Sequence, residues 1–203
     1  MNPDHKILMV IPTAGGIHEQ TAAAAAVMAR RPNVAFAIAR GRPHDYARNQ
    51  AVQMMLGGDF THLFFLDSDV EPPLDAIGRL AAHDAPVATG FYPINYGHLR
   101  WAVCRQRRDD GRWPMLNAGD LPPEPITVAG CGAGCLLIRR EVFEQLGWPW
   151  FRWEHRADGY QLGEDLFFCR RCADAEIPIL ADPAVICRHY KEIDLLSVME
   201  IKN

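Results

Sequence analysis

Short apolar runs alternate with longer segments of helical character along most of the chain. Uninterrupted runs that are closed by Pro, Gly or a charged residue are typical of buried strands. The predicted strands are Lys6–Ile11, Val34–Ala39, His62–Leu66, Pro86–Gly90, Ile126–Ala129, Cys135–Ile138 and Ala184–Cys187. The predicted helices are Ile17–Arg31, His44–Leu56, Pro73–His83, Arg140–Leu146 and Asp165–Ala175. This alternation predicts an α/β fold with a central, mostly parallel mixed sheet flanked by helices.

The stretch Tyr92–Pro125 breaks the regular pattern, because it is rich in Gly, Pro, Arg and Asp. Strands around Arg100–Arg105 fit the pattern, but nothing in it defines their pairing. No repeat, low-complexity tract or linker divides the chain. Because 203 residues suit one domain with a sizeable core, we expect residues 1–203 to form a single domain.

Charge and apolar content narrow the classes of function. The formal net charge of −4 argues against broad electrostatic binding of nucleic acid. No segment reaches the ~18 uninterrupted apolar residues that a membrane span needs. The N-terminus runs directly into a predicted strand and lacks the apolar core and cleavage site of a signal peptide. We therefore expect a cytoplasmic protein without a transmembrane segment.

Six cysteines raise the question of a zinc site. They are Cys104, Cys131, Cys135, Cys169, Cys172 and Cys187. The spacings of Cys131 with Cys135 and of Cys169 with Cys172 resemble those of metal ligands. The alternative is that they are small, soft side chains buried as reduced thiols, which is the usual state in a cytosolic protein. We favour the second interpretation and keep the first as a hypothesis.

The strongest chemical signal is Asp67-Ser68-Asp69, directly after the predicted strand His62–Leu66. Ligands of open α/β sheets bind outside the carboxyl ends of the strands. Two carboxylates one residue apart at such a place can hold a hard divalent cation, which in turn can neutralise a diphosphate. The alternative is a solvated turn that caps the next helix. The position after a buried strand favours the functional interpretation.

A second acidic pair, Glu164-Asp165, opens the predicted helix Asp165–Ala175. Such a pair complements the helix dipole, which is sufficient reason for its presence. Its functional interpretation is a general base for an acceptor hydroxyl, or a carboxylate that positions the acceptor.

His189 follows the last predicted strand and is the third signal. A lone histidine is more often an ordinary surface or core residue, but a neutral imidazole can also complete a metal shell.

Taken together and in this order, the three signals resemble the GT-A glycosyltransferases, especially the large family-two group. Further stretches that resemble this group are Val10-Ile11-Pro12-Thr13, Ala47-Arg48-Asn49-Gln50-Ala51, the segment Gly134–Phe143 and the segment Gly163–Arg171. The resemblance covers nearly the whole chain apart from Tyr92–Pro125. It implies a nucleotide-diphosphate sugar as donor, a hydroxyl acceptor and a divalent cation, Mn²⁺ or Mg²⁺.

The resemblance also implies roles on the donor side. Asp69 would bind the cation directly, His189 would be the other protein ligand, and Asp67 would contact ribose or metal-bound water. Contacts with the nucleotide sugar are implied for Pro12, Thr13, Arg48 and Ser68. The family usually has acidic residues after its second strand, whereas this chain has Arg40-Gly41-Arg42-Pro43. We therefore expect Arg40 to contact phosphate, and the nucleotide base stays open.

On the acceptor side, the resemblance implies that Asp165 is the catalytic base of an inverting reaction and that Glu164 binds the acceptor or the donor sugar. Gly132 lies in the glycine-rich entry to the acceptor side. The segment Trp148–Trp153 carries three of the five tryptophans, whose flat faces suit contact with a sugar. Trp150 is our candidate there, and a core-closing loop is the alternative.

Two other classes of function stay open. A nucleotidyltransferase also uses carboxylate-held Mg²⁺ on a related sheet, but the turn after the first strand, Pro12–Ile17, has no basic residue for a phosphate loop. A non-catalytic module that binds nucleotide or carbohydrate on the same fold is the third hypothesis. An acceptor-independent hydrolysis assay would separate it from an enzyme.

Overall fold

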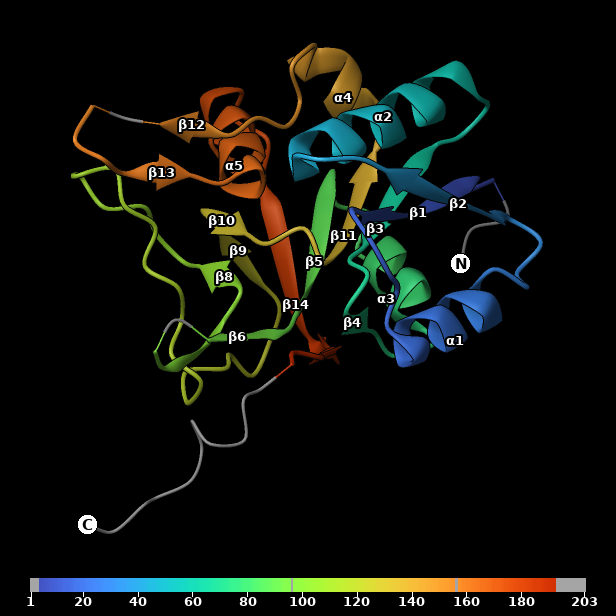
Figure 1. Cartoon of the computed structure of the whole chain (residues 1–203), viewed down its shortest axis with the longest axis horizontal. Helices are drawn as coiled ribbons and strands as arrows, with labels where there is room; N and C mark the ends of the chain where they lie inside the picture. Colours follow the sequence, from blue (N-terminus) through green and yellow to red (C-terminus); the bar gives the residue numbers. More distant parts are fainter. Residues whose placement is uncertain (1–3, 96, 156, 193–203) are drawn as a thin grey trace, which may run out of the picture.

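A seven-stranded mixed sheet runs through the computed structural model, which describes residues 4–95, 97–155 and 157–192 (Figure 1). In order across the sheet, its strands are β2 (Val34–Arg40), β1 (Ile7–Thr13), β3 (His62–Leu66), β11 (Cys135–Arg139), β5 (Val87–Phe91), β14 (Ile179–Ile186) and β9 (Ile126–Val128). Strands β11 and β9 run antiparallel to their neighbours, and the other strands run in one direction. The predicted α/β fold with a mostly parallel mixed sheet is confirmed.

Helices cover both faces of the sheet (Figure 1). Helices α2 (His44–Gly57), α4 (Arg140–Leu146) and α5 (Glu164–Asp174) lie on one face, and α1 (Glu19–Met28) and α3 (Ala76–Ala82) on the other. Strand β1 shows why, because its side chains alternate between two buried clusters: Leu8 and Val10 belong to the first, and Ile7 and Met9 to the second. Within the described ranges, no helix combines the length and apolar content needed to cross a bilayer.

Short strand pairs surround one end of the sheet. They are β4 (Val70–Glu71) with β15 (Arg188–His189), β6 (Pro93–Asn95) with β7 (Leu99–Trp101), β8 (Val103–Cys104) with β10 (Gly130–Cys131), and β12 (Glu154–His155) with β13 (Gln161–Leu162). The irregular stretch Tyr92–Pro125 thus supplies β6, β7 and β8. The pair β4–β15 brings the segment after Asp69 next to His189.

The last strand of the chain to join the sheet, β14, begins earlier than predicted. Strand β14 starts at Ile179 rather than at Ala184, because Asp182 and Pro183 interrupt the apolar pattern without ending the strand. The buried Asp182 carboxylate accepts hydrogen bonds from His83 at 2.8 Å and from the Ala184 N–H at 2.8 Å. The pairing register with β5 shifts between Asp182 and Ile186, so the interruption is absorbed as a bulge.

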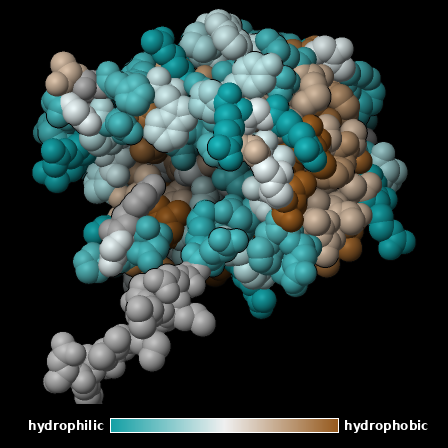
Figure 2. Space-filling model, viewed as in Figure 1, coloured by the Kyte–Doolittle hydropathy of each residue, from teal (hydrophilic) through white to brown (hydrophobic). Residues whose placement is uncertain are grey.

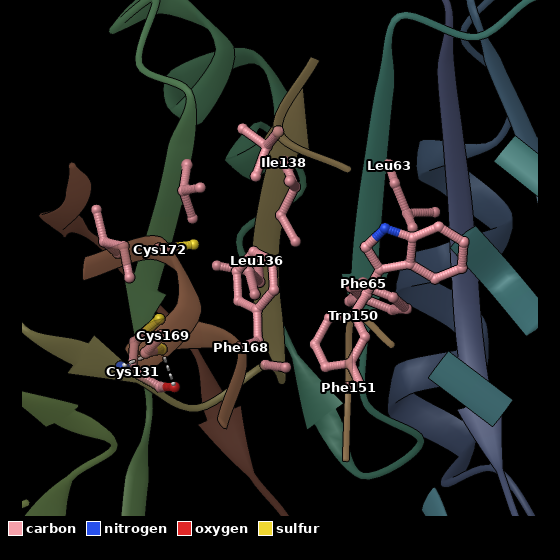
Figure 3. Close-up of a cluster of buried hydrophobic side chains, with 14 of the residues drawn as sticks. Leu63, Phe65, Cys131, Leu136, Ile138, Trp150, Phe151, Phe168, Cys169 and Cys172 are labelled. Carbon is pink, nitrogen blue, oxygen red and sulfur yellow. Dashed lines mark hydrogen bonds between the residues drawn. The ribbon is translucent and has the colours of Figure 1, made fainter. Parts of the chain in front are cut away.

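Buried thiols account for the cysteines. All six are free and buried. The Cys131 N–H donates to Cys169 Sγ at 3.4 Å, and the Cys169 thiol donates to the Cys131 carbonyl at 3.5 Å (Figure 3). Cys131 and Cys135 belong to different core clusters, so this spaced pair does not converge on one point. Across the part of the chain that the structure describes, no group of three or more His, Cys, Asp or Glu side chains is arranged to hold a metal ion.

One edge of the sheet leaves apolar side chains in contact with solvent. Phe36 and Ile38 on the edge strand β2 are 41% and 42% exposed, because α1 packs mainly beside β4 rather than over β2. Figure 2 shows hydrophobic residues gathered on this side of the molecule, over β2 and α1. The apolar runs of the sequence therefore predict strands correctly, but full burial of this strand is wrong.

Close approach of two strands requires a glycine at position 90 of β5. A Cβ at Gly90 would lie 2.7 Å from both the carbonyl oxygen and Cγ1 of Val185, which belongs to β14. We expect Gly90→Ala to lower the free energy of unfolding by about 1–3 kcal/mol, because the strands must separate to admit the methyl group. Urea unfolding would measure this.

Gly78→Ala is the matched control, since a Cβ there meets only Arg31 Nη1, at 3.8 Å, and the position lies inside α3. We expect this variant to gain up to about 1 kcal/mol. Equal unfolding midpoints for Gly90→Ala and the wild type would contradict the close approach.

Candidate active site

Most of the predicted site residues line one cavity of about 290 Å³. Asp67, Ser68 and Asp69 reach it from the turn after β3, and Arg48 reaches it from α2. The remaining lining residues come from distant parts of the chain and include Tyr92, Gly132, Glu164, Asp165, His189 and Lys191. The topology therefore brings together groups more than 140 positions apart, as Arg48 and Lys191 are, which is expected for the carboxyl ends of strands in an α/β sheet.

The side chain of Arg48 joins the two acidic motifs. Its Nη2 donates to Asp67 Oδ1 at 2.8 Å, and its Nε donates to Glu164 Oε1 at 3.2 Å. The guanidinium is buried and lies over the ring of Phe65, with 5.3 Å between its carbon and the ring centroid. Burial acts to lower the pKa of Arg48, but the charges of Asp67 and Glu164 outweigh it and raise the pKa. Arg48 Nη1 is buried and has no hydrogen-bond partner among the described residues.

Asp165 has a carboxyl group suited to accepting a proton near neutral pH. Desolvation by the surrounding protein, reinforced by the charge of Glu164, raises its pKa to about 7. Arg48 and the Leu166 N–H, which donates to Asp165 Oδ1 at 2.7 Å, act in the opposite direction. A carboxyl with such a pKa is half ionised at neutral pH, which is the range in which general acid–base catalysis is most effective.

Asp69 and His189 converge at the other side of the cavity. Asp69 Oδ2 lies 3.4 Å from His189 Nε2 and 2.5 Å from Lys191 Nζ. Burial acts to raise the pKa of Asp69, but the hydrogen bonds with His189 and Lys191 lower it to about 2. Asp69 is therefore ionised at neutral pH.

The hydrogen bonding of His189 fixes which ring nitrogen faces Asp69. Its Nδ1 lies 2.7 Å from the Pro93 carbonyl oxygen, which only accepts, so Nδ1 carries a proton. A proton on Nε2 as well lets the ring donate to the Asp69 carboxylate, and loss of that proton would leave a lone pair beside the carboxylate. Two such acceptors side by side suit a shared cation, and a carbonyl that orients the far nitrogen is usual for metal-binding histidines. The donor set therefore fits a divalent cation with two protein ligands and an otherwise open shell.

Four predicted residues lie away from the cavity, and three of them belong to β1 and β2. Thr13 is buried, and its Oγ1 organises the turn after β1 by accepting from the Gly15 N–H at 3.1 Å. Pro12 is buried in β1, and Arg40 is exposed at the end of the edge strand β2.

Trp150 lies in the core rather than in a cavity wall (Figure 3). It is 7% exposed, and its indole N–H donates to the Phe143 carbonyl at 2.8 Å. The core-closing alternative is the one that fits this position. Trp153, three residues on, lines a second cavity.

This second cavity, of about 660 Å³, adjoins the first. Its aromatic lining comes from Trp113, Trp153 and Tyr160, and it shares Met115, Glu164 and Asp165 with the smaller cavity. The carboxyl group with the raised pKa thus stands where the two cavities meet.

Sequence reasoning missed Tyr92 and Lys191. The Tyr92 hydroxyl accepts from the Gly134 N–H at 3.2 Å, and a Cβ at Gly132 would lie only 2.0 Å from that hydroxyl. Tyr92 follows a predicted strand, as Asp67 does, and this position could have marked it as a residue of the site. Lys191 stands two residues after His189, so the two share a side in extended chain.

The chain matches no family model, and no curated protein matches it. Solved structures that share its fold include A197 from STIV, with a TM-score of 0.65 and 22% identity over 92% of this chain and 86% of that chain. Another is GalNAc-T7 with UDP, GalNAc and Mn²⁺, with a TM-score of 0.61 and 13% identity. That match covers 96% of this chain and 45% of the GalNAc-T7 chain, so this chain spans less than half of its length. The likeness shows that the fold is of the GT-A type.

Removing the Arg48 guanidinium should leave the Asp67 and Glu164 carboxylates without their positively charged partner. Loss of one partner of a buried ion pair costs about 3–5 kcal/mol, so Arg48→Met should lower the free energy of unfolding by about that amount near pH 8. The loss should be smaller near pH 5, because Asp165, whose pKa is raised to about 7 and whose charge also faces Arg48, is then protonated. Urea unfolding at both pH values would test this.

The double variant Arg48→Met with Glu164→Gln should recover part of the lost stability, since it removes one of the stranded charges. A single Arg48→Met variant as stable as the wild type near pH 8 would show that Arg48 does not join the two motifs energetically.

Proposed function

We propose that this protein is a metal-dependent glycosyltransferase that moves a sugar from a nucleotide-diphosphate sugar to a hydroxyl acceptor with inversion. The observation that carries the proposal is the position of Asp165, which borders both a cavity with cation-binding groups and a larger aromatic cavity. A transferase needs such an arrangement, because donor and acceptor must meet at one base. The order of motifs along the chain further supports membership of the family-two group.

On the donor side, Asp69 and His189 would hold Mn²⁺ or Mg²⁺. The cation supplies charge that neutralises the departing diphosphate. Asp67, fixed by Arg48, would contact ribose or the cation's water shell. Ser68 lines the same cavity, and the turns at Thr13 and Arg40 would approach the nucleotide from its edge. The buried and unpartnered Arg48 Nη1 offers one further donor to the nucleotide sugar.

On the acceptor side, the aromatic cavity would receive the molecule that carries the attacking hydroxyl. Trp153 is 36% exposed and offers a face for contact with a sugar ring, the role that we first considered for Trp150. Glu164 is held by Arg48, so it would position a substrate hydroxyl rather than accept its proton. Asp165 would take that proton as the hydroxyl attacks the anomeric carbon.

Asp165→Asn keeps the shape of the side chain and removes the base. We expect sugar transfer to fall about 10²–10⁴-fold, the usual contribution of general base catalysis, while nucleotide binding persists. The wild-type kcat should fall as the pH drops below about 7, because Asp165 then becomes protonated. A transfer assay that resolves nucleoside diphosphate, pyrophosphate and the anomeric configuration of the product would measure this.

Wild-type transfer rates in Asp165→Asn, or a product that retains the donor configuration, would rule out Asp165 as the base. Release of pyrophosphate instead of nucleoside diphosphate would identify a nucleotidyltransferase.

Asp69→Asn should abolish the dependence of nucleotide binding on the cation, because the amide lacks the charge that holds it. Calorimetry with uridine and guanosine diphosphate, with and without Mn²⁺, would measure the affinity and indicate the base. Unchanged Mn²⁺-dependent affinity in a folded variant would contradict the cation assignment.

A further inference from the structure

The ammonium group of Lys191 contacts Asp69 Oδ2, the carboxylate oxygen that faces His189 in the proposed cation site. Lys191 Nζ donates to Asp69 Oδ2 at 2.5 Å, and the same oxygen lies 3.4 Å from His189 Nε2. Like charges at such separations repel, so the ammonium competes for Oδ2 with a divalent cation that Oδ2 and His189 Nε2 would share. A cation held by these two groups would therefore displace Lys191.

The backbone on which Lys191 stands is well held. The Tyr190 N–H donates to the Asp69 carbonyl at 2.8 Å, and β15 pairs with β4 just before it. The Tyr190 ring stacks on His18 with 3.9 Å between ring centroids. These contacts fix the start of the side chain, whereas the four-carbon stem leaves the ammonium free to move.

The surroundings offer Lys191 a second position. It lines the small cavity together with Asp69 and also a neighbouring cavity of about 680 Å³ that includes Gly16, His18 and Ser68. Its side chain is 59% exposed, so leaving Asp69 costs little desolvation or packing. A diphosphate in the small cavity would bring new anionic oxygens within reach of the same ammonium.

We propose that Lys191 couples cation binding to diphosphate binding by exchanging partners. Without nucleotide it neutralises Asp69 and weakens the hold of the site on a divalent cation. When a nucleoside diphosphate enters, the ammonium pairs with the phosphate oxygens, and Asp69 becomes free for the cation. This inference rests on the proposed function, which supplies both the cation and the diphosphate. Lys191 is thus a positioning residue whose effect is a binding coupling between the two ligands.

Binary titrations test the exchange without any turnover. Lys191→Met keeps much of the stem and removes the charge, so Mn²⁺ should bind the nucleotide-free variant about three- to tenfold more tightly than it binds the wild type. Uridine diphosphate without Mn²⁺ should bind the variant more weakly by a similar factor. Lys191→Arg should behave like the wild type, since it keeps the charge. Mn²⁺ binding is measured by electron paramagnetic resonance and uridine diphosphate binding by calorimetry.

Lys6→Met is the matched control, because Lys6 forms a comparable exposed ion pair with Asp59 just before the start of β1, at the end opposite to the site. It should leave both affinities unchanged. Mn²⁺ affinities that are equal in Lys191→Met and the wild type would overturn the exchange while leaving the proposed cation site intact. If neither protein binds Mn²⁺, both the exchange and the cation part of the proposed function are overturned.

Discussion

The buried guanidinium of Arg48 is the interaction on which the site depends. It joins the turn after β3 to the first turn of α5 through α2, and its contact with Glu164 spans 116 positions of the chain. Carboxylates in a low-dielectric interior persist as ions only beside a compensating charge. Without Arg48, Asp67 and Glu164 would lose the positive charge that their carboxylates contact at the cavity wall. The same charge also limits how far the pKa of Asp165 rises.

Much of the fold follows from local sequence patterns. Apolar runs identified the strands of the sheet, and a helical pattern located α2, α4 and α5 closely, because these features depend on neighbouring residues. The beginning of β14 was missed, since Asp182 interrupts the apolar pattern and is stabilised within the strand by His83, a residue distant in sequence. The pairing of β8 with β10 was not predictable either, because these strands lie far apart in the sequence, and the irregular pattern did not mark the local hairpin of β6 and β7.

The candidate site shows the same division. Asp67, Asp69, Glu164 and Asp165 follow or open regular elements, so their common location could be inferred from topology. Trp150 could not be placed, because a tryptophan in a loop suits a core and a sugar equally well. The ion pair between Lys191 and Asp69 has no sequence signature, since it depends on how β15 lies beside β4.

The contact between Tyr92 and the glycine-rich turn has a consequence for how the chain can vary. The phenol occupies the space that a side chain at Gly132 would need and also crowds Gly134, where a Cβ would lie 2.9 Å from the ring. Neither glycine can be enlarged while the tyrosine stays, and a smaller residue at 92 would open a hole in the cavity wall. Substitutions at the three positions are therefore coupled: relatives of this chain should keep all three residues or replace them together.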